Sequence, residues 1–447
     1  MKVTVHGGVE EIGGNKILLE DKDARIWLDM GQSFSFGEEL FAEFLGPRMR
    51  FGLRDYFALD LMPKIPGLYS HEMLESTDFP YRRPEFSAIL LSHVHFDHST
   101  HIAFADPKIP VHLGKGTRTI LDVWEETSAM VNMGDHDYRT FRTGDKLKID
   151  GVDARPVHVD HSVPAAYGHI LHCPSGTVVY TGDLRRHGPH ASMTDDFVEA
   201  AKRAKPDLLI CEGTRIDPND KRENYSEKDV KTLSTNEVNK AKGKLAVVTF
   251  YPRDVDRMRT FYEVARATGR DFVASAKTAR LLMALEGDSH IRVPRVKKDP
   301  GLLVYLREMD KPKRWERELA EAAGNRVVGA DYVRKNQDSV ILQLDFTHLT
   351  ELIDIQPKRG GIFIHSKSEP FEEDDVEDMV KKNWLKHFGL SEHQFHASGH
   401  LNRKELEELV REIDADKVIP VHTEHPEMFK DFADKVIVPR KGVAIGL

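Results

Sequence analysis

A nine-residue segment, SHVHFDHST at residues 92–100, places three histidines and an aspartate directly behind a short apolar run. Imidazole and carboxylate groups bind borderline divalent metals, and a loop behind a strand can direct alternate side chains at one point. His93 and His95 can share one ion, whereas Asp97 and His98 lie one turn further along. The segment therefore predicts a metal site at a strand end, and a second ion is the natural reason for all four side chains.

Four side chains from one loop cannot complete two metal sites, so other strand ends must supply further ligands. The candidates each follow a β-rich run, and they are His161, Asp183 and His422. Asp183 is suited to bridge two ions because a carboxylate has two oxygens. Asp29 also ends an apolar run, and we expect it to accept a hydrogen bond from a ligand or a metal-bound water.

Length and composition limit the class of protein. The 447 residues, 40% of them hydrophobic, are enough for two domains with substantial cores. Two cysteines, no apolar N-terminal stretch and no apolar run long enough to cross a bilayer predict a reduced, cytoplasmic protein without a membrane partner. A net charge of -9 argues against a generally basic nucleic-acid surface but allows a local groove.

The pattern of secondary structure that the sequence predicts changes along the chain. Short β-rich runs separated by glycine-rich turns come first and predict an antiparallel start. Later, charged helical segments alternate with apolar strands, which is typical of a parallel α/β sheet. Histidine-bearing strand ends return near the C-terminus, so we expect the α/β block to be inserted into the first domain. The predicted boundaries give one domain from 1–218 and 391–447 and a second from 219–390.

Three kinds of segment within this frame bear on function. Residues 34–84 are too long for a tight connection and too aromatic for a disordered linker, so we expect an ordered insertion. An acid- and lysine-rich helix is expected at 371–386. Trp315 and the phenylalanines of the insertion could stack on bases, although aromatic side chains are more often core. Basic runs could line an RNA groove, although they are more often solvated faces; they lie at 292–298, 311–317 and 356–361.

The order and context of the metal-type residues resemble the metallo-β-lactamase-fold hydrolases. The resemblance implies an α/β protein whose first domain is an αββα sandwich with two zinc ions at one rim. In the ligand sets that it implies, the first ion is bound by His93, His95 and His161, the second by Asp97, His98 and His422, and Asp183 bridges them.

Three further segments resemble motifs A, B and C of the β-CASP nucleases. They are LLICEGT with Glu212, FHASGH with His400 and IPVHTEH with His422. The inserted parallel-sheet block is then the β-CASP domain. Within that family, three segments are most similar to the ribonuclease J group: GGVEEIGGNK (7–16), GIFIHSKSEP (361–370) and HASGH (396–400). The resemblance covers essentially the whole chain. The chain ends at Leu447 without the C-terminal domain of many bacterial members, as expected of the archaeal type.

The resemblance implies a zinc-dependent ribonuclease that works mainly from 5' to 3' on single-stranded RNA with a 5'-monophosphate, with endonuclease action as a second mode. Its role would be RNA decay or maturation; manganese as a supporting metal and a homodimer are both allowed. His400 would protonate the leaving 3'-oxygen, Glu212 would hold its other ring nitrogen, and Asp97 and Asp29 complete the catalytic set. The residues expected to bind RNA phosphate are His396, Ser398, Ser366, Ser368 and Arg253.

The sequence departs from the family pattern at three places. The metal loop ends in Ser99 and Thr100, where the family usually has a glycine, so the following backbone is expected to differ. Arg253 stands in place of a phosphate-contacting serine, and Asp254 in place of a neighbouring asparagine, so 5'-phosphate binding is expected to differ in detail. The insertion at 34–84 is longer than the family's usual connection.

Alternatives remain at several residues and for the function. Asp29 could be an ordinary turn aspartate, and the serine and glycine segments expected to bind phosphate could be plain turns. Glu212 could form a salt bridge with Arg215, and His400 could cap a helix before Asn402; the resemblance, rather than the spacing, favours their catalytic roles. A strict endoribonuclease of the cleavage and polyadenylation factor type shares motifs A, B and C. A small-molecule thioesterase or lactonase of the same fold would not need the inserted domain. A non-catalytic scaffold is disfavoured because all seven ligand positions are filled.

Overall fold

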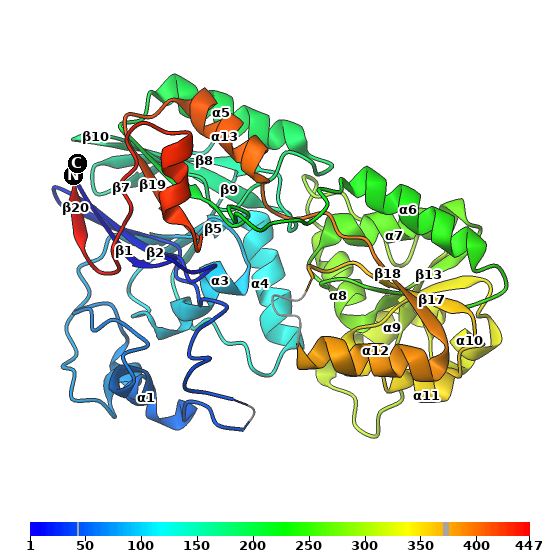
Figure 1. The fold of residues 1–447 in the computed structure, drawn as a ribbon. Coiled ribbons are helices and arrows are strands. Elements are labelled where there is room, and N and C mark those ends of the chain that lie inside the picture. The colour runs from blue at the N-terminus through cyan, green and yellow to red at the C-terminus, as the bar shows by residue number, and fades with distance from the viewer. Residues whose placement is uncertain (43, 370–374) are drawn as a thin grey trace.

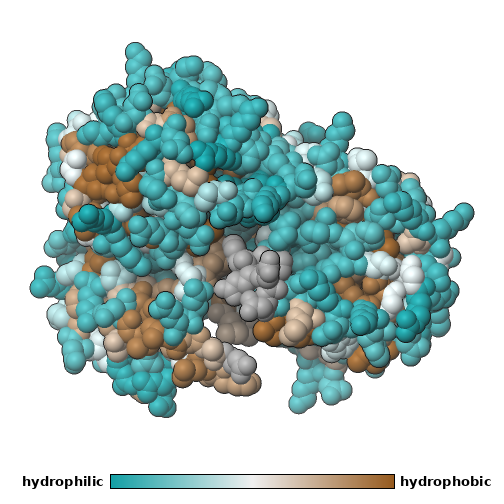
Figure 2. All heavy atoms as spheres, viewed as in Figure 1, coloured by the Kyte–Doolittle hydropathy of each residue, from teal (hydrophilic) through white to brown (hydrophobic). Residues whose placement is uncertain are grey.

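The computed structural model describes residues 1–42, 44–369 and 375–447 (Figure 1). Two sheets lie face to face on one side of the molecule, and a third sheet with its helices lies beside them. Hydrophilic side chains cover most of the face that Figure 2 shows. Within the described ranges, no helix has the length and apolar character needed to cross a bilayer.

The first sheet begins as the antiparallel arrangement that the sequence predicts and becomes parallel from β3 onward. The chain termini meet at its edge, where the Leu447 amide donates to the Met1 carbonyl oxygen (3.1 Å). In order across the sheet the strands are β20 (Ala444–Gly446), β1 (Lys2–Gly7), β2 (Lys16–Asp21), β3 (Ala24–Leu28), β4 (Ala88–Leu90), β5 (Val111–Gly114) and β6 (Tyr138–Phe141).

The second sheet packs on the first through one shared core, to which strands of both sheets contribute fully buried residues such as Val5, Leu28, Val178 and Ile210. Burial of alternate residues on facing strands is the ordinary way in which two sheets form a sandwich. The strands in order are β19 (Val418–Val421), β11 (Leu208–Glu212), β10 (Gly176–Tyr180), β9 (Ala166–Cys173), β8 (Val152–Val159) and β7 (Leu147–Ile149).

Helices cover both outer faces of this pair of sheets. α5 (Ala191–Ala204) buries Thr194, Phe197, Val198 and Ala201, a spacing that puts one apolar stripe against the second sheet. The other covering helices are α13 (Arg403–Ile413) on the second sheet and α4 (Lys115–Thr127) on the first. The predicted αββα sandwich is therefore confirmed.

The predicted insertion at 34–84 packs into the core on the outer face of the first sheet. Its elements are short, namely η1 (Met49–Phe51), α1 (Arg54–Ala58) and α2 (His71–Leu74). Order comes from buried side chains such as Leu53, Phe57 and Tyr69, which join strand residues in one core cluster. The described part of the segment is thus an ordered insertion, as expected.

The third sheet is parallel throughout, as the alternation of helices and strands predicts. In order its strands are β15 (Val327–Val328), β14 (Leu302–Tyr305), β13 (Asp271–Ser275), β16 (Val340–Gln343), β12 (Ala246–Thr249), β17 (Gly361–His365) and β18 (Leu390–Gln394). Helices that belong to this region are α6 (Glu227–Lys240), α7 (Val255–Ala267), α8 (Ala276–Leu285), α9 (Arg314–Ala323), α10 (Ala330–Lys335), α11 (Glu351–Ile355) and α12 (Val376–Phe388), with η3 (Gly324–Arg326) and η4 (Phe346–His348).

The segment that forms the third sheet is inserted in the sequence between two strands that are neighbours in the second sheet. β11 pairs with β19 in parallel, although the whole third sheet separates them in sequence. The domain boundaries at 218 and 390 remain predictions, and β18 carries the third sheet on to Gln394. The helix expected at 371–386 is α12 from Val376 onward, and residues 371–374 lie outside the described residues.

Candidate metal centre

The predicted metal loop connects the buried strand β4 with a short helix, α3 (Phe96–Ser99). After the strand, the loop turns His93 and His95 toward the rim of the sandwich. The first helical turn then adds Asp97 and His98, both buried. Successive residues of one loop therefore reach two neighbouring positions, as the spacing suggested.

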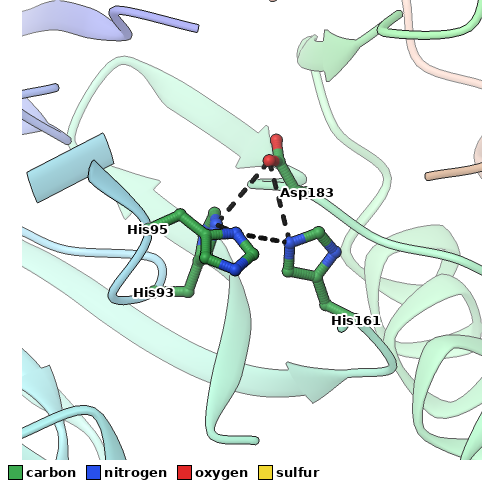
Figure 3. A group of neighbouring side chains, drawn as sticks. All are labelled: His93, His95, His161 and Asp183. Atoms are coloured by element: carbon green, nitrogen blue, oxygen red, sulfur yellow. Dashed lines mark hydrogen bonds and ion pairs between the residues drawn. The ribbon is translucent and has the colours of Figure 1, made fainter. Parts of the chain in front are cut away.

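The first ligand group consists of His93, His95, His161 and Asp183, whose ligand-type atoms lie within 4.8 Å of one another (Figure 3). His161 comes from the loop after β8 and Asp183 from the loop after β10. His95 Nδ1 lies 3.0 Å from both His93 Nε2 and His161 Nε2. Three imidazoles and one carboxylate thus converge on a single point.

The second ligand group consists of Asp97, His98, Asp183 and His422, also within 4.8 Å of one another. His422 follows β19 in a left-handed conformation (φ 56°). Its Nε2 lies 2.9 Å from Asp97 Oδ2, and His98 Nε2 lies 3.0 Å from Asp183 Oδ2. Asp183 belongs to both groups, in the position expected of a bridging carboxylate.

The unsatisfied polar atoms of these groups fit a bound cation. Asp183 is 1% exposed, and neither of its oxygens makes a hydrogen bond of good geometry within the described residues, although His98 Nε2 lies 3.0 Å from Oδ2. A buried carboxylate that has only imidazoles around it is disfavoured unless a cation compensates its charge. This histidine and aspartate set matches the preferences of zinc. The residues present are therefore able to bind metal.

In the first ligand group, burial also sets the protonation state that metal binding needs. It lowers the pKa of His93 and His161 well below the ordinary value and that of His95 to about 3. These imidazoles are therefore neutral near pH 7, with a lone pair available for a metal ion.

Asp29 lies behind the metal loop and holds His98. Its Oδ2 accepts a hydrogen bond from His98 Nδ1 (2.7 Å) and another from the Tyr180 hydroxyl (2.6 Å). The Ser92 amide and hydroxyl also donate to this carboxylate, each over 2.7 Å. With Nδ1 protonated, Nε2 of His98 is left as the ligand atom. Ser92 and Tyr180 were not identified from the sequence, where a serine and a tyrosine carry no signal of this contact.

The glycine-rich N-terminal turn supports the backbone of the metal loop. The amides of Gly14 and Asn15 donate to the Asp97 carbonyl oxygen (3.0 and 3.2 Å). A Cβ at Gly31 would lie 1.6 Å from that same oxygen, and a Cβ at Gly13 (φ +79°) would lie 2.7 Å from the Asp97 Cβ. Only glycine allows such close approach, so the GGVEEIGGNK segment and Gly31 together fix where Asp97 lies.

His400 and Glu212 lie together at the edge of the second ligand group. Both Glu212 oxygens are 3.2 Å from His400 Nδ1, and Glu212 is 1% exposed. The Thr214 hydroxyl donates to Glu212 Oε2 (2.5 Å) and lies 2.9 Å from His422 Nδ1, so it links the two sites. Thr214 was also missed from the sequence.

Neither structural alternative for this pair is present. Arg215 pairs with Asp220 (3.2 Å) instead of Glu212. The cap of α13 is Asn402 itself, whose side chain accepts from the Glu405 amide. Glu212 and His400 are thus directed toward each other and toward Asp183.

The five residues expected to bind phosphate do not form one pocket. Ser366 is buried beside Arg257, whose Nη1 donates to its hydroxyl oxygen (2.6 Å) and lies 3.2 Å from His396 Nδ1. The Ser398 hydroxyl accepts from the His400 amide (3.1 Å). Ser368 lines a separate cavity beside β17. Arg253 lies over the Trp124 ring at 4.0 Å, next to the metal loop.

Arg257 organises this region, although no sequence pattern distinguishes it from the other cations of its helix. It is fully buried and donates to Glu227 (2.8 Å) and to the carbonyl oxygen of Ala397 (3.0 Å). Glu227 also pairs with Arg185 (3.7 Å), which reaches into the sandwich. This buried ion network therefore joins α6 and α7 to the loop that carries His400.

Two aromatic predictions have different outcomes. Trp315 is 6% exposed and packs in a core cluster of the third sheet, so it offers no exposed stacking face. Phe34 of the insertion is 49% exposed and lies edge-on to Phe96 at 4.7 Å, one residue from Asp97. An aromatic surface thus flanks the second ligand group.

Comparisons with known proteins agree with this arrangement. Residues 65–252 match the β-lactamase superfamily domain, and residues 391–443 match the Zn-dependent metallo-hydrolase RNA specificity domain. Ribonuclease J of Sinorhizobium meliloti is 26% identical over 382 residues, covering 81% of this chain and 62% of that protein. Ribonuclease J of Pyrococcus abyssi is 22% identical over 474 residues, covering 100% of this chain and 94% of that protein.

A solved structure supports the fold independently. The crystal structure of a protein of unknown function from Enterococcus faecalis V583 has a TM-score of 0.80 at 24% identity, and the match covers 100% of this chain and 99% of the other. The chain spans 62% of the length of the Sinorhizobium relative and 59% of a Helicobacter pylori ribonuclease J.

The sandwich thus carries a β-lactamase superfamily domain, with two groups of metal-type ligands at its rim. Motifs A, B and C lie around these groups, and the parallel third sheet is inserted between β11 and β19. The chain shares these features with the β-CASP nucleases and is similar over most of its length to ribonuclease J proteins.

Proposed function

We propose that this chain is a zinc-dependent ribonuclease that hydrolyses RNA phosphodiester bonds, mainly from the 5' end and with endonuclease action as a second mode, in RNA decay or maturation. The observation that carries the proposal is the pair of buried ligand groups that share Asp183, with His400 and Glu212 at their edge. The ribonuclease J relatives and the RNA specificity domain support RNA as the substrate.

Two zinc ions are proposed, one in each ligand group, with Asp183 between them. Zinc bound there would lower the pKa of water to about 7 and offset the negative charge that a phosphodiester develops during hydrolysis. The chain's own contribution is to hold the ligands in place. Asp29 orients His98, and Thr214 orients His422, so that each imidazole presents Nε2 to the site.

His400 is proposed to protonate the leaving 3'-oxygen. Its Nδ1 donates to Glu212, which leaves Nε2 as the nitrogen able to carry the transferred proton. The side chain of His400 is 20% exposed, whereas that of Glu212 is 2% exposed, so the imidazole is the partner that a substrate reaches. Glu212 is therefore a positioning residue that stabilises the charged imidazolium.

Single-stranded RNA suits the surroundings of the ligand groups. Phe34 is 49% exposed beside the metal loop, and aromatic rings of RNA-binding proteins stack on unpaired bases rather than on bases held in a duplex. Arg253 and Ser398 are proposed to contact the phosphate groups on either side of the scissile bond. Because the Ser366 hydroxyl and His396 already contact Arg257, we propose that they shape the loop around Ser398.

RNA labelled at each end and carrying a 5'-monophosphate, triphosphate or hydroxyl group tests this function with zinc or manganese. We expect mononucleotides from the 5'-monophosphate substrate and slower cleavage of circular RNA. Cleavage of circular and linear RNA at equal rates would instead indicate a strict endoribonuclease. Hydrolysis of thioesters or lactones without any RNA product would overturn the proposal in favour of a small-molecule hydrolase.

A further inference from the structure

A cavity of about 390 Å³ opens at the carboxyl ends of β13, β14 and β16 in the third sheet. Ser275, Tyr305 and Gln343 are the last residues of those three strands, and all line it. Parallel α/β sheets commonly bind ligands just outside the carboxyl ends of their strands. None of the residues that line this cavity belongs to the metal-ligand groups.

Two buried side chains of the cavity offer hydrogen-bond donors that are not used. Gln343 is 1% exposed, and its Oε1 accepts from the Ser275 amide (3.0 Å), which leaves Nε2 as a free donor. Within the described part of the chain, neither this Nε2 nor Nε1 of Trp315 has a hydrogen-bond partner. An unpaired buried donor is unfavourable, so the cavity fits a ligand rich in hydrogen-bond acceptors.

The cationic side chains that line the cavity favour an anionic ligand among those rich in hydrogen-bond acceptors. Four cations line the cavity, and none forms an ion pair with a carboxylate of the described residues: Lys277, Arg307, Lys313 and Arg317. Of the two acids in the lining, Glu316 accepts from the Lys313 amide (2.7 Å) and Asp345 pairs with Lys367 (3.5 Å). Helix α8 begins at this cavity with Ser275 as its cap, and the N-terminal end of the helix adds further positive character.

A second cavity of about 280 Å³ adjoins this one on the side of Arg253. The two cavities share Thr127, Lys277, Asp345 and His348 in their linings, and the second one extends to Arg253. Arg253 is near the metal loop: burial lowers its pKa to about 10, while Tyr251 and Asp97 act in the opposite direction. A chain of cationic side chains thus leads from the metal-ligand groups to the first cavity.

We propose that the cavity at the ends of β13, β14 and β16 binds a phosphate group of a nucleotide, and that this nucleotide belongs to the strand held at the metal centre. The assignment to the strand rests on the proposed ribonuclease function. A free nucleotide offers the same phosphate chemistry, so the two sources are separated by experiment.

The test uses the full-length protein carrying Asp183→Ala, so that bound RNA is not hydrolysed. Binding of inorganic phosphate, AMP and a single-stranded RNA oligonucleotide is measured in this background with and without Gln343→Glu. That change keeps the acceptor for the Ser275 amide but replaces the free donor by a carboxylate oxygen. Lys277→Gln is the second variant, and Lys228→Gln on the exposed side of α6 is the matched control.

Because a charge-assisted hydrogen bond contributes about 1.5 to 3 kcal/mol, we expect Gln343→Glu to weaken oligonucleotide binding about 10- to 100-fold. Lys277→Gln should weaken it less and reduce its salt dependence, and Lys228→Gln should leave both unchanged. Thermal melting checks folding; if Gln343→Glu does not fold, Lys277→Gln carries the test.

If Gln343→Glu and Lys277→Gln leave the affinity for all three probes unchanged, the cavity is not a phosphate-binding site. Weaker binding of phosphate or AMP with unchanged oligonucleotide binding would overturn the assignment to the strand and identify a free nucleotide as the ligand. Both readouts come from a protein that cannot cleave, so they are independent of whether the unmodified protein hydrolyses RNA with zinc.

Discussion

The rim of the sandwich and the carboxyl edge of the third sheet both gather polar side chains at strand ends, but of opposite kinds. The rim gathers imidazoles and carboxylates, and its unsatisfied atoms include both oxygens of Asp183. The third sheet gathers cations and free donors, including Gln343 Nε2. One edge therefore suits metal cations and the other suits phosphate anions. Strand-end geometry supplies a place, and the residue types decide which charge it attracts.

The largest expected effect comes from removing the carboxylate that both ligand groups share. Asp183→Ala should reduce RNA hydrolysis by at least about a thousandfold, because the charge stabilisation by metal is lost. Bound zinc, measured by elemental analysis, should fall below two per chain. Asp153→Ala, an exposed carboxylate on β8, is the control and should change neither value. Full activity in Asp183→Ala would show that the rim of the sandwich does not depend on bound metal, and the contrast between a metal-binding edge and a phosphate-binding edge would be wrong.

The next effect separates metal binding from proton transfer at the rim. His400→Ala should slow the chemical step about 100- to 10,000-fold, as expected for loss of a general acid, while two zinc ions remain bound. Glu212→Gln should have a smaller effect and alter the pH profile of the rate, because the imidazolium loses its carboxylate partner. If His400→Ala instead released zinc at unchanged rate per bound metal, His400 would be a ligand.

The buried ion network around Arg257, which joins α6 and α7 to the loop that carries His400, should contribute to the stability of the fold. Arg257→Ala leaves Glu227 buried without its main partner and should lower the free energy of unfolding by about 3 to 5 kcal/mol. Urea denaturation measures the change. Arg259→Ala, on the same helix but partly exposed, should cost much less.

The same network predicts a dependence on pH. Burial raises the pKa of Glu227, but Arg257 and its other partners outweigh this effect and lower the pKa to about 2 from an ordinary 4.5. Because the pKa is lower in the folded state, this stabilisation is complete above about pH 4.5 and is lost as the pH falls toward 2. The stability difference between the unmodified protein and Glu227→Gln should therefore shrink over that range. A constant difference would show that the carboxylate charge contributes nothing.

The smallest effect concerns the end of the metal loop, where the family usually has glycine. The Ser99 hydroxyl donates to the carbonyl oxygens of Val94 (3.2 Å) and His95 (2.9 Å), and the Thr100 hydroxyl donates to that of Phe96 (2.6 Å). Ser99→Ala should thus lower the free energy of unfolding by about 1 kcal/mol with zinc affinity nearly unchanged. A large loss of zinc would show that these hydroxyls position the ligands.

The ligand groups could be predicted from sequence because metal chemistry restricts both residue type and position. Only a few side chains bind zinc, and His161, Asp183 and His422 each follow a strand, where the rim of the sandwich brings them together. The parallel third sheet was predictable for a similar reason, because helical and apolar segments alternate over a long stretch.

The supporting contacts could not be predicted because their residue types carry no such restriction. Ser92, Tyr180 and Thr214 are ordinary residues until the fold brings them against Asp29, Glu212 and His422. Arg257 looked like one cation among many in a charged helix, although it is fully buried. Trp315 was a candidate for stacking on bases, but it is buried in the core of the third sheet and lines the cavity there.

The most direct test of the two-metal ribonuclease is a zinc titration of the metal-free protein, with hydrolysis of 3'-end-labelled, 5'-monophosphorylated RNA measured at each step. The account predicts little activity at one zinc ion per chain, a steep rise as the second binds, and no rise in Asp183→Ala. Full activity at one zinc ion per chain, or the same rise in Asp183→Ala, would contradict it.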